Sequence, residues 1–242
     1  ALHRQDGLKF DWRKVSELAK EYAAQNKQLH FFRMICREFP PVFHRWFLNR
    51  FIEPTAWFEN RLIYTRSVAA WSMVGYLLGL GDRHGENILL DEKSGECVHV
   101  DFDCLFDRGL TLDQPERVPF RLTQNVIDGF GITGCVGLFQ KSCEAMLSVL
   151  RSNRDTLMNV LYSFVHDPLV EWKDKNSGQD RRKQANKIMD RIETRLKGKM
   201  IQGNKNEMEL SLSVRGQVHQ LIEDASSEDN LSLMYIGWMP FL

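Results

Sequence analysis

Apolar residues recur every three or four positions through most of this chain, which is the spacing of amphipathic helices. The first third shows this spacing from Trp12 to Phe51, with interruptions at Pro40-Pro41 and Glu53-Pro54-Thr55, where helices are expected to end. A long helix is predicted from about Trp57 to Leu78, because the run is largely apolar and closes with Gly79-Leu80-Gly81, a common helix ending. The opening third is therefore predicted to be helical.

The same spacing returns in the second half. Helices are predicted near Leu138–Leu150 and Asp155–Val165, and a further helix with a basic exposed side at Arg181–Leu196. The polar stretch Lys173–Asp180 has the composition of a flexible connection. A last helix is predicted from one apolar face, and an aromatic end follows it; the residues are Val214, Val218, Leu221, Ile222 and Ala225, then Tyr235, Trp238 and Phe241.

One segment breaks the helical pattern. Residues 87–103 read NILLDEKSGECVHVDFD, where a short apolar run, a polar turn at Ser94-Gly95 and an alternating run predict a β-hairpin. Residues 102–119 show no period and contain Gly109 and two prolines, so we expect a long irregular loop, and such loops are usually functional. The predicted fold class is therefore α+β and mainly α-helical, with one small β-hairpin.

Composition narrows the class of protein. With 242 residues, of which 43% are hydrophobic, the chain can bury a sizeable core. Lys and Arg total 32 and Asp and Glu total 32, so the chain has no net charge that would hold it on nucleic acid or on an anionic membrane. Any association with DNA is therefore expected to come through a partner or through a region outside these 242 residues. The five cysteines form no C-x-x-C pair, which predicts free thiols in a reducing compartment. The most apolar run, Val68–Gly81, has about 14 residues against the roughly 20 that a bilayer span needs, so a buried helix is predicted.

The polar residues around the hairpin have the pattern of a phosphoryl-transfer site. GDRHGENILL at 81–90 places Asp82 and Asn87 at the interval found in the kinase loop H-R-D-x-x-x-x-N, and Asp101 is followed by Phe102 as in D-F-G. Mg²⁺ and the γ-phosphate require oxygen ligands, and the attacking hydroxyl needs a proton acceptor. We therefore expect Asp82 to be the base and Asn87 with Asp101 to hold the metal. His84 could donate to the γ-phosphate or relay a proton.

Each of these residues also has a simpler interpretation. An Asp-Arg pair at a helix end, such as Asp82-Arg83, is usually a cap or a surface ion pair. His99 is expected to be structural, because an alternating strand places it opposite the apolar face. A zinc site at Cys97, His99 and Cys104 is disfavoured, because the spacing matches no common zinc motif. The ordered set of base, amide ligand and second carboxylate around one hairpin favours a kinase.

Five sequence motifs carry a resemblance to a known family. GLGDRHGENILL, ECVHVDFDCLF and VPFRLT resemble the phosphatidylinositol 3-kinase-related protein kinases, and HDPLVEW at 166–172 resembles their checkpoint-kinase branch. The closing MYIGWMPFL resembles the family's C-terminal domain, which is called FATC. The resemblance covers about residues 29–242. The ending WMPFL and Asp103 differ slightly from the vertebrate form, which implies a fungal or other divergent member.

The resemblance implies a domain plan and residue roles. It implies the C-lobe of a phosphatidylinositol-3-kinase-like protein kinase fold at 1–172, a regulatory connection at 173–209 and a helical FATC domain at 210–242. The catalytic loop would lie at about 80–90 and the activation loop at about 101–120. The implied roles are catalysis by Asp82 and His84, binding of ATP with Mg²⁺ or Mn²⁺ by Asn87 and Asp101, an adenine-pocket floor from Leu89 and Val100, and an activation loop that includes Phe102, Asp103 and Phe120.

The resemblance also implies an activity and partners. It implies a nuclear serine/threonine kinase that acts on Ser or Thr followed by Gln in DNA-damage and replication-stress checkpoint signalling. The expected partners are protein substrates and an obligate interacting subunit, with indirect contact to single-stranded DNA through its binding protein, in a dimeric assembly and without a membrane. These 242 residues alone are expected to be inactive, because the N-lobe with its phosphate loop and ATP-binding lysine would lie upstream.

Two other functions remain open. A phosphoinositide lipid kinase shares D-R-H-x-x-N, but its activation loop must neutralise inositol phosphates with Lys and Arg. Residues 102–118 carry four acidic and two basic side chains, a balance of −2 that favours a protein substrate. A catalytically inactive scaffold of the same family would be expected to have lost part of the charged set.

The aromatic end has two interpretations as well. We expect it, with the apolar stripe 214–225, to pack against the activation-loop side of the lobe. Binding of Tyr235, Trp238 and Phe241 to a membrane interface is the less favoured alternative.

Overall fold

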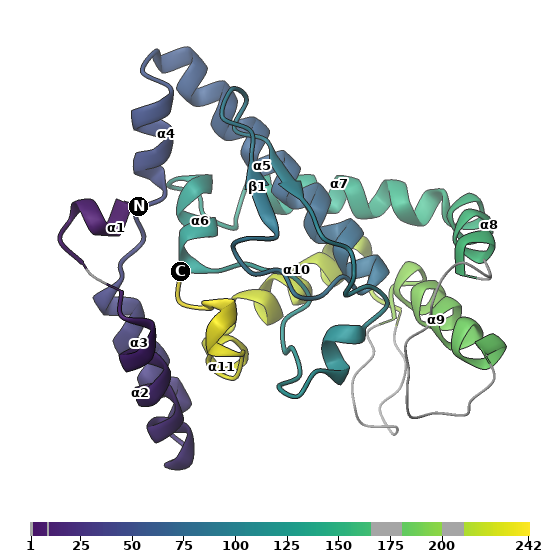
Figure 1. Ribbon diagram of the computed structural model, residues 1–242. Coiled ribbons are helices and arrows are strands. Elements are labelled where there is room, and N and C mark those ends of the chain that lie inside the picture. Colours follow the sequence, from purple (N-terminus) through teal and green to yellow (C-terminus); the bar gives the residue numbers. More distant parts are fainter. Residues whose placement is uncertain (1, 9, 166–180, 200–210) are drawn as a thin grey trace. The chain divides into compact units, whose positions relative to one another are not determined.

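The computed structural model describes residues 2–8, 10–165, 181–199 and 211–242 (Figure 1). These residues form two compact units, one made of Ala1–Cys143 with His219–Leu242 and the other of Glu144–Val218. In the described residues, no helix is long and apolar enough to cross a membrane. All five cysteines are free thiols, as the composition predicted.

The first unit begins with four helices, and the predicted helical opening is confirmed. They are α1 (Leu2–Gln5), α2 (Trp12–Ala24), α3 (Gln28–Glu38) and α4 (His44–Arg50). Asp11 caps α2, because its carboxylate accepts from the backbone N–H groups of Arg13 and Lys14. Helix α3 ends before Pro40-Pro41 and α4 ends before Pro54, so both predicted interruptions are confirmed.

The long helix α5 (Pro54–Leu78) leads into the site. The helix starts at Pro54, three residues before the predicted start at Trp57. Proline is tolerated in the first turn because the N–H it lacks would have no partner there, and the Glu53 carboxylate caps this turn by accepting from the Ala56 N–H at 2.7 Å. Its end is as predicted: Gly79 adopts a left-handed φ of 61° and donates its N–H to the carbonyls of Gly75 and Tyr76. The chain leaves α5 directly into the predicted catalytic loop.

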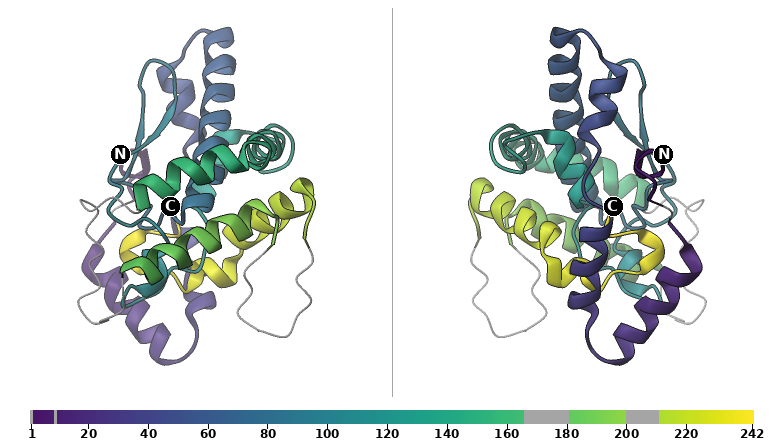
Figure 2. Two further views of the ribbon diagram at one scale, coloured as in Figure 1. Left: turned by 90° about the vertical axis from the view of Figure 1, so that its right-hand side faces the viewer. Right: turned by 90° about the vertical axis from the view of Figure 1, so that its left-hand side faces the viewer.

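The predicted hairpin is confirmed. Strands β1 (Ile88–Leu90) and β2 (Cys97–His99) pair antiparallel with Leu89 opposite Val98. Asp91 closes the turn, because its carboxylate accepts from the backbone N–H groups of Lys93 and Ser94. The hairpin lies along α5 (Figures 1 and 2), where Trp71 Nε1 donates to the Cys97 carbonyl at 3.0 Å.

The segment after the hairpin is the predicted irregular loop, with one exception. A 3₁₀ helix, η1 (Arg108–Thr111), interrupts it and was not predicted. Helix α6 (Gln124–Phe130) follows and was also missed. It has only seven residues, too few for an apolar repeat to stand out.

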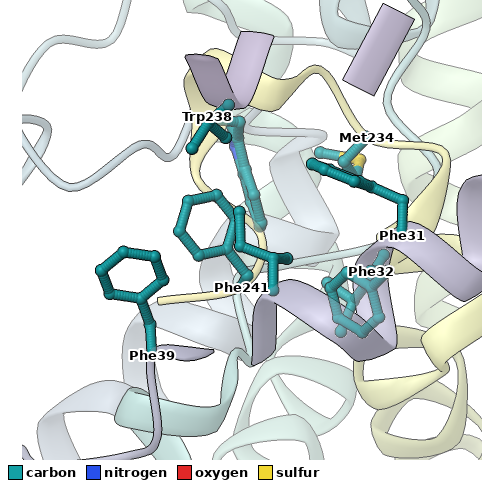
Figure 3. Close-up of a cluster of buried hydrophobic side chains, with 9 residues drawn as sticks. Phe31, Phe32, Phe39, Met234, Trp238 and Phe241 are labelled. Atoms are coloured by element: carbon teal, nitrogen blue, oxygen red, sulfur yellow. The ribbon is translucent and has the colours of Figure 1, made fainter. Parts of the chain in front are cut away.

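The C-terminal segment supplies one half of a buried aromatic cluster in the first unit. After α10 (Val214–Ser226), the chain forms α11 (Glu228–Ser232) and η2 (Ile236–Trp238). Figure 3 shows Trp238 and Phe241 lying against Phe31, Phe32 and Phe39, which belong to α3 or directly follow it. The principal partner of the aromatic end is therefore α3, which the sequence did not reveal.

Part of the expected packing against the activation loop is also present, through the residues just before the aromatic end. Gln114 Nε2 donates to the Leu233 carbonyl at 3.0 Å, and the Arg117 N–H donates to Met234 Sδ at 3.2 Å. Of the three aromatic residues considered for a membrane interface, Trp238 and Phe241 are 4% and 0% exposed, which removes them from a membrane surface in this conformation, whereas Tyr235 is 54% exposed.

The second unit contains the predicted later helices. Helix α7 (Leu138–Ser152) enters it from the first unit, α8 (Arg154–Val165) packs on α9 (Arg181–Leu196), and α10 leaves it. Arg151 Nη1 donates to the Leu212 carbonyl at 3.1 Å, which connects α7 with the segment before α10. The predicted flexible connection at 173–180 and the HDPLVEW motif lie outside the described residues.

Candidate active site

Asp82 lies on a strained turn between α5 and β1. Its φ is 56°, a left-handed value that a residue with a Cβ seldom adopts, and such values persist where the surroundings hold them. The preceding Gly81 N–H donates to the Cys104 carbonyl at 2.7 Å, and the Asp82 N–H donates to Glu116 Oε1 at 2.8 Å. Both groups that hold this turn come from the activation loop. The position of the expected base therefore depends on that loop.

Asn87 is buried, with 6% of its surface exposed, and its amide is oriented by the backbone. Its side-chain Nδ2 donates to the Asp82 carbonyl at 2.8 Å, and its own N–H donates to the His84 carbonyl at 3.1 Å. With the nitrogen directed to a carbonyl, Oδ1 is the atom that can serve a metal ion.

Asp101 follows the hairpin at the end where Asn87 begins it. The Val100 N–H donates to the Asn87 carbonyl at 3.0 Å, which extends the strand pairing by one bond and brings the two predicted metal ligands to the same end. Asp101 is exposed and has a left-handed φ of 59°, and its Oδ1 accepts from the Asp103 N–H at 3.1 Å. The backbone thus presents this carboxylate outward.

Arg83 joins the two halves of the site. Its guanidinium donates to the carbonyls of Gly81 at 2.9 Å and Val100 at 2.7 Å, and also to the Asp101 carbonyl. Arg83 is 3% exposed, so interpreting Asp82-Arg83 as a surface ion pair is wrong. Burial lowers the pKa of Arg83, and the carboxylates of Asp82 and Asp101 oppose this shift. One buried cation therefore fixes the catalytic loop against the segment that carries Asp101.

His84 faces the expected base. Its Nδ1 accepts from the Glu86 N–H at 3.2 Å, which places the proton of a neutral imidazole on Nε2. That Nε2 lies 4.0 Å from Asp82 Oδ2. The two side chains predicted to be catalytic are therefore neighbours, with the N–H of His84 on the side of the carboxylate.

The outer face of the hairpin is apolar and exposed. Leu89 is 49% exposed, Val98 opposite it is 39% exposed, and Val100 lies on the same face by strand alternation. Phe102, which is 46% exposed, does not belong to this face, because its ring stacks on Trp71 at 6.0 Å. An exposed apolar patch adjoining oxygen ligands suits a flat, weakly polar group such as a nucleobase.

The inner face of the hairpin has a structural role. His99 stacks on Trp71 with ring centroids 4.8 Å apart, and burial, with Arg83 nearby, lowers its pKa to about 4. Burial raises the pKa of Cys97 to about 12, so its thiol stays protonated. No group of three His, Cys, Asp or Glu side chains within the described ranges could hold a metal ion, which leaves the zinc alternative without support. The structural interpretation of His99 is confirmed.

The activation loop is anchored beside the end of α5. Phe106 and Asp107 both have left-handed φ values, 59° and 64°, and donate their N–H groups to the carbonyls of Leu78 and Gly79. A Cβ on Gly79 would lie 2.5 Å from the Asp107 nitrogen, so this close approach requires glycine. Of the predicted loop residues, Phe102 and Asp103 are exposed and Phe120 is buried.

Glu116 is a site residue that the sequence analysis used only as a loop charge. Besides holding Asp82, it donates its own N–H to the Gly109 carbonyl at 3.0 Å, and a Cβ on Gly109 would lie 2.1 Å from its Oε2. Burial raises the pKa of Glu116, and the nearby Asp82 carboxylate adds to the increase, although the Asp82 N–H and Arg83 oppose it.

Arg121, within VPFRLT, was missed as well. It lies over the Trp238 ring at 4.4 Å and donates to the carbonyls of Trp238 at 2.7 Å, Met239 at 3.0 Å and Arg83 at 3.4 Å. Burial lowers its pKa to about 10, so it remains charged at neutral pH. The only signal in the sequence was a charge inside an apolar run. Arg121 connects the catalytic loop with the C-terminal segment.

Asn87 and Asp101 provide the kind of oxygen donors that a Mg²⁺ ion bound to a nucleotide requires. The amide oxygen of Asn87 and the carboxylate of Asp101 are hard donors, and Mg²⁺ typically takes one or two such protein ligands and completes its shell with phosphate and water. The neighbouring Asp82 and exposed apolar hairpin face are consistent with phosphate chemistry beside a base-binding surface.

Comparison with known proteins identifies related families. The model described as phosphatidylinositol 3- and 4-kinase matches residues 3–174, and the FATC domain model matches residues 211–242. Serine/threonine-protein kinase ATR of Arabidopsis thaliana is 51% identical over 240 residues, which cover 96% of this chain and 9% of that protein. Protein kinase rad3 of Schizosaccharomyces pombe is 50% identical over 212 residues, which cover 87% of this chain and 9% of that protein.

Solved structures give the same result. The FAT and kinase domain of CtTel1 has a TM-score of 0.84 and 34% identity, covering 99% of this chain and 16% of that one. The complete CtTel1 dimer with C2 symmetry has a TM-score of 0.80 and 37% identity, covering 94% of this chain and 8% of that one. The chain spans about a tenth of the length of the curated relatives it matches.

Proposed function

This chain belongs to the phosphatidylinositol 3- and 4-kinase family and carries a FATC domain, as its motifs predicted, and we propose that it is the C-lobe of a serine/threonine protein kinase of the ATR type. The observation that carries the proposal is the binding of buried Arg83 to carbonyls on both sides of the hairpin. This contact keeps Asp82 and Asn87 on one scaffold with Asp101. The similarity to kinases named ATR and rad3 supports the same conclusion.

Each site residue has a proposed task. Asp82 accepts the proton of the attacking hydroxyl, and His84 holds a proton on Nε2 beside that carboxylate. Asn87 and Asp101 hold Mg²⁺, or Mn²⁺ in its place, and Leu89 with Val100 contacts the adenine. ATP with its metal ion supplies the phosphoryl group and balances its charge when bound.

The proposed substrate is a protein with Ser or Thr followed by Gln, in DNA-damage and replication-stress checkpoint signalling. The negative balance of residues 102–118 disfavours a phosphorylated lipid headgroup. The relatives that match this chain at 42–54% identity over most of its length carry protein-kinase names.

The proposal extends to assembly and location. We propose a nuclear complex with an obligate subunit of the ATR-interacting-protein type, which brings the kinase to single-stranded DNA through the protein that coats it. The balanced charge of this chain supports indirect contact with DNA. Similarity to a structure described as a C2-symmetric dimer supports a dimeric complex.

The test uses the full-length kinase with its subunit, because these 242 residues alone are proposed to turn over no ATP. Phosphorylation of a Ser-Gln peptide is compared with a Ser-Pro peptide and with phosphatidylinositol vesicles. Asp82→Ala should lower the rate on the Ser-Gln peptide by about 10²- to 10⁴-fold, the usual contribution of a general base. Glu92→Gln, which alters an exposed ion pair with Arg50 in the same unit, is the matched control and should stay within about twofold.

Four results would count against the proposal. Preferential phosphorylation of the lipid would support a phosphoinositide kinase. Equal rates on both peptides would remove the Ser-Gln assignment. A fully active Asp82→Ala variant would show that the catalytic assignment is wrong, and an inactive wild-type complex would support the scaffold.

A further inference from the structure

A groove with a volume of about 420 Å³ lies in the first unit, lined by α2, α3 and the C-terminal segment at 232–241. Helix α3 supplies the buried part of the lining through Phe31, Phe32 and Ile35. Figure 3 shows Phe31 and Phe32 in one cluster with Met234 and Phe241, which also line the groove. Pockets for small organic ligands usually have volumes of about 300–1,000 Å³. The groove is therefore large enough for such a ligand.

The groove does not use the residues of the proposed nucleotide site. Among the residues that the structure describes, its lining contains no member of the catalytic loop at 80–90 or of the hairpin. The activation loop contributes Gln114, whose Nε2 donates to the Leu233 carbonyl at 3.0 Å. A molecule bound in the groove would therefore contact the activation loop without occupying the place of ATP.

The exposed part of the lining is aromatic. Trp12, at the start of α2, is 39% exposed, and Tyr235, in the C-terminal segment, is 54% exposed. The other apolar or small positions that α2 contributes are Ser16, Ala19 and Ala23, whose short side chains leave room in front of the α3 rings. Aromatic rings attract one another beyond what their buried area contributes, so this lining favours a flat aromatic ligand over an aliphatic one.

Lys20 gives the groove its charge. It is exposed, and it is the only charged residue among the described residues of the lining. Its ammonium group makes no ion pair or hydrogen bond with the residues that the structure describes, although Glu17 and Glu21 lie on the same helix. The polar side chains of Gln28 and Gln114 are neutral. One positive charge without a counter-ion at the edge of an apolar surface attracts an anion.

We propose that this groove binds a small aromatic carboxylate, with its ring against Trp12, Tyr235 and the α3 side chains and its carboxylate at Lys20. The single cation matches a single negative charge. A second negative charge, as in a phosphate dianion or a dicarboxylate, would lie against the apolar lining without a partner, which is unfavourable. The chemistry of the lining therefore specifies a monoanion with an aromatic body.

The bound molecule would join three segments of the first unit. It would contact α2, the C-terminal segment and Gln114 of the activation loop. Because Gln114 already binds the Leu233 carbonyl, occupancy is expected to restrain the place where the C-terminal segment meets this loop. Binding itself does not depend on the kinase assignment, since it is measured without ATP or a peptide.

The test compares 2-naphthylacetate with 2-naphthylacetamide, which has nearly the same shape and no charge. Hydrogen exchange of the full-length kinase with its subunit, followed by mass spectrometry, should slow at residues 12–24 and 232–237 as 2-naphthylacetate is added. At low salt its dissociation constant should be about 2- to 5-fold lower than that of the amide, the effect of one exposed ion pair. This preference should decrease as salt is added, because salt screens the interaction.

Three variants separate the contributions. Lys20→Gln should remove the preference for the carboxylate while both compounds still bind through their rings. Lys14→Gln changes an exposed lysine on the same helix outside the lining, so it is the matched control and should keep the preference. Ala23→Trp places a ring in the groove from an exposed position and should abolish binding of both compounds, with exchange of the α5 peptides as the control for folding.

Three outcomes would overturn the proposal. One is unchanged exchange at residues 12–24 and 232–237 of the wild-type protein up to the solubility limit of both compounds. Another is equal affinity of the wild type for the carboxylate and the amide at low salt. The third is a preference for the carboxylate that persists in Lys20→Gln, since the anion would then have another partner.

Discussion

Glu116 gives the sharpest prediction, because one carboxylate connects the activation loop to the turn of the proposed base. Its Oε1 accepts from the Asp82 N–H at 2.8 Å, and Asp82 has a left-handed φ of 56° that its neighbours must maintain. We therefore expect substitutions of Glu116 to lower the phosphorylation rate without touching ATP or the peptide.

The magnitude follows from the hydrogen bond. A bond with one charged partner contributes about 1.5–3 kcal/mol and a neutral bond about 0.5–1.5 kcal/mol. Glu116→Gln keeps an acceptor oxygen and should lose about 1 kcal/mol, or about fivefold in kcat/KM. Glu116→Ala also leaves the Asp82 N–H without its partner and should lose about 2–3 kcal/mol, or about 30- to 150-fold.

The assay is steady-state phosphorylation of one peptide by the full-length complex, with kcat and KM for ATP determined separately. Gly109→Ala is an independent perturbation, because its Cβ would lie 2.1 Å from Glu116 Oε2 and displace the same carboxylate. Glu92→Gln serves as the surface-charge control. If Glu116→Ala stays within twofold of the wild type, the carboxylate does not hold the catalytic turn and the reasoning is wrong.

Three further predictions concern stability. Because burial raises the pKa of Glu116, the folded protein binds the proton of this carboxyl more tightly than the unfolded chain does, and the resulting stability is complete below the ordinary pKa of 4.5 and is lost as the pH rises through the raised pKa. The melting temperature of Glu116→Gln, which does not titrate, should therefore increase relative to that of the wild type from pH 4.5 towards neutrality. A difference in melting temperature that stays constant with pH would contradict this prediction. Arg121→Lys cannot reproduce the planar contacts to Trp238 and Met239 and should lower the free energy of unfolding by about 2–4 kcal/mol in a melting experiment. Hydrogen exchange at residues 236–242 should also become faster, and unchanged exchange there would refute the contact. Gly79→Ala should lower the free energy of unfolding by at least about 2 kcal/mol, because φ at this position is 61° and the added Cβ would lie 2.5 Å from the Asp107 nitrogen. Gly75→Ala is the control in the same melting assay: its Cβ would meet Leu80 at 3.7 Å, an ordinary contact, so it should be neutral or stabilising by up to about 1 kcal/mol.

Features encoded by neighbouring residues could be predicted from the sequence. The hairpin followed from an alternating run and a polar turn, and the end of α5 followed from Gly79. Asn87 and Asp101 were expected to meet because strand pairing brings the two ends of a hairpin together. In each case the residues that determine the local structure lie within about 15 positions of one another, so local backbone geometry is enough to predict it.

Features that depend on distant contacts could not be predicted. Glu116 lies 34 positions from Asp82, and Arg121 lies 117 positions from Trp238. No local period distinguishes a buried Arg83 from one on the surface, since its role arises from carbonyls that only the folded chain brings together. The packing of the aromatic end on α3 was hidden for the same reason, because its apolar spacing specifies a buried face and not the partner.

Arg121 recognises the C-terminal segment chiefly through main-chain oxygens, and this has a consequence for sequence variation. Carbonyl positions report the path of the backbone, so replacing the side chain of Met239 leaves its acceptor in place. Inserting or deleting one residue after Trp238 would instead shift every later acceptor out of register. We therefore expect this segment to tolerate side-chain substitutions better than insertions or deletions of a residue.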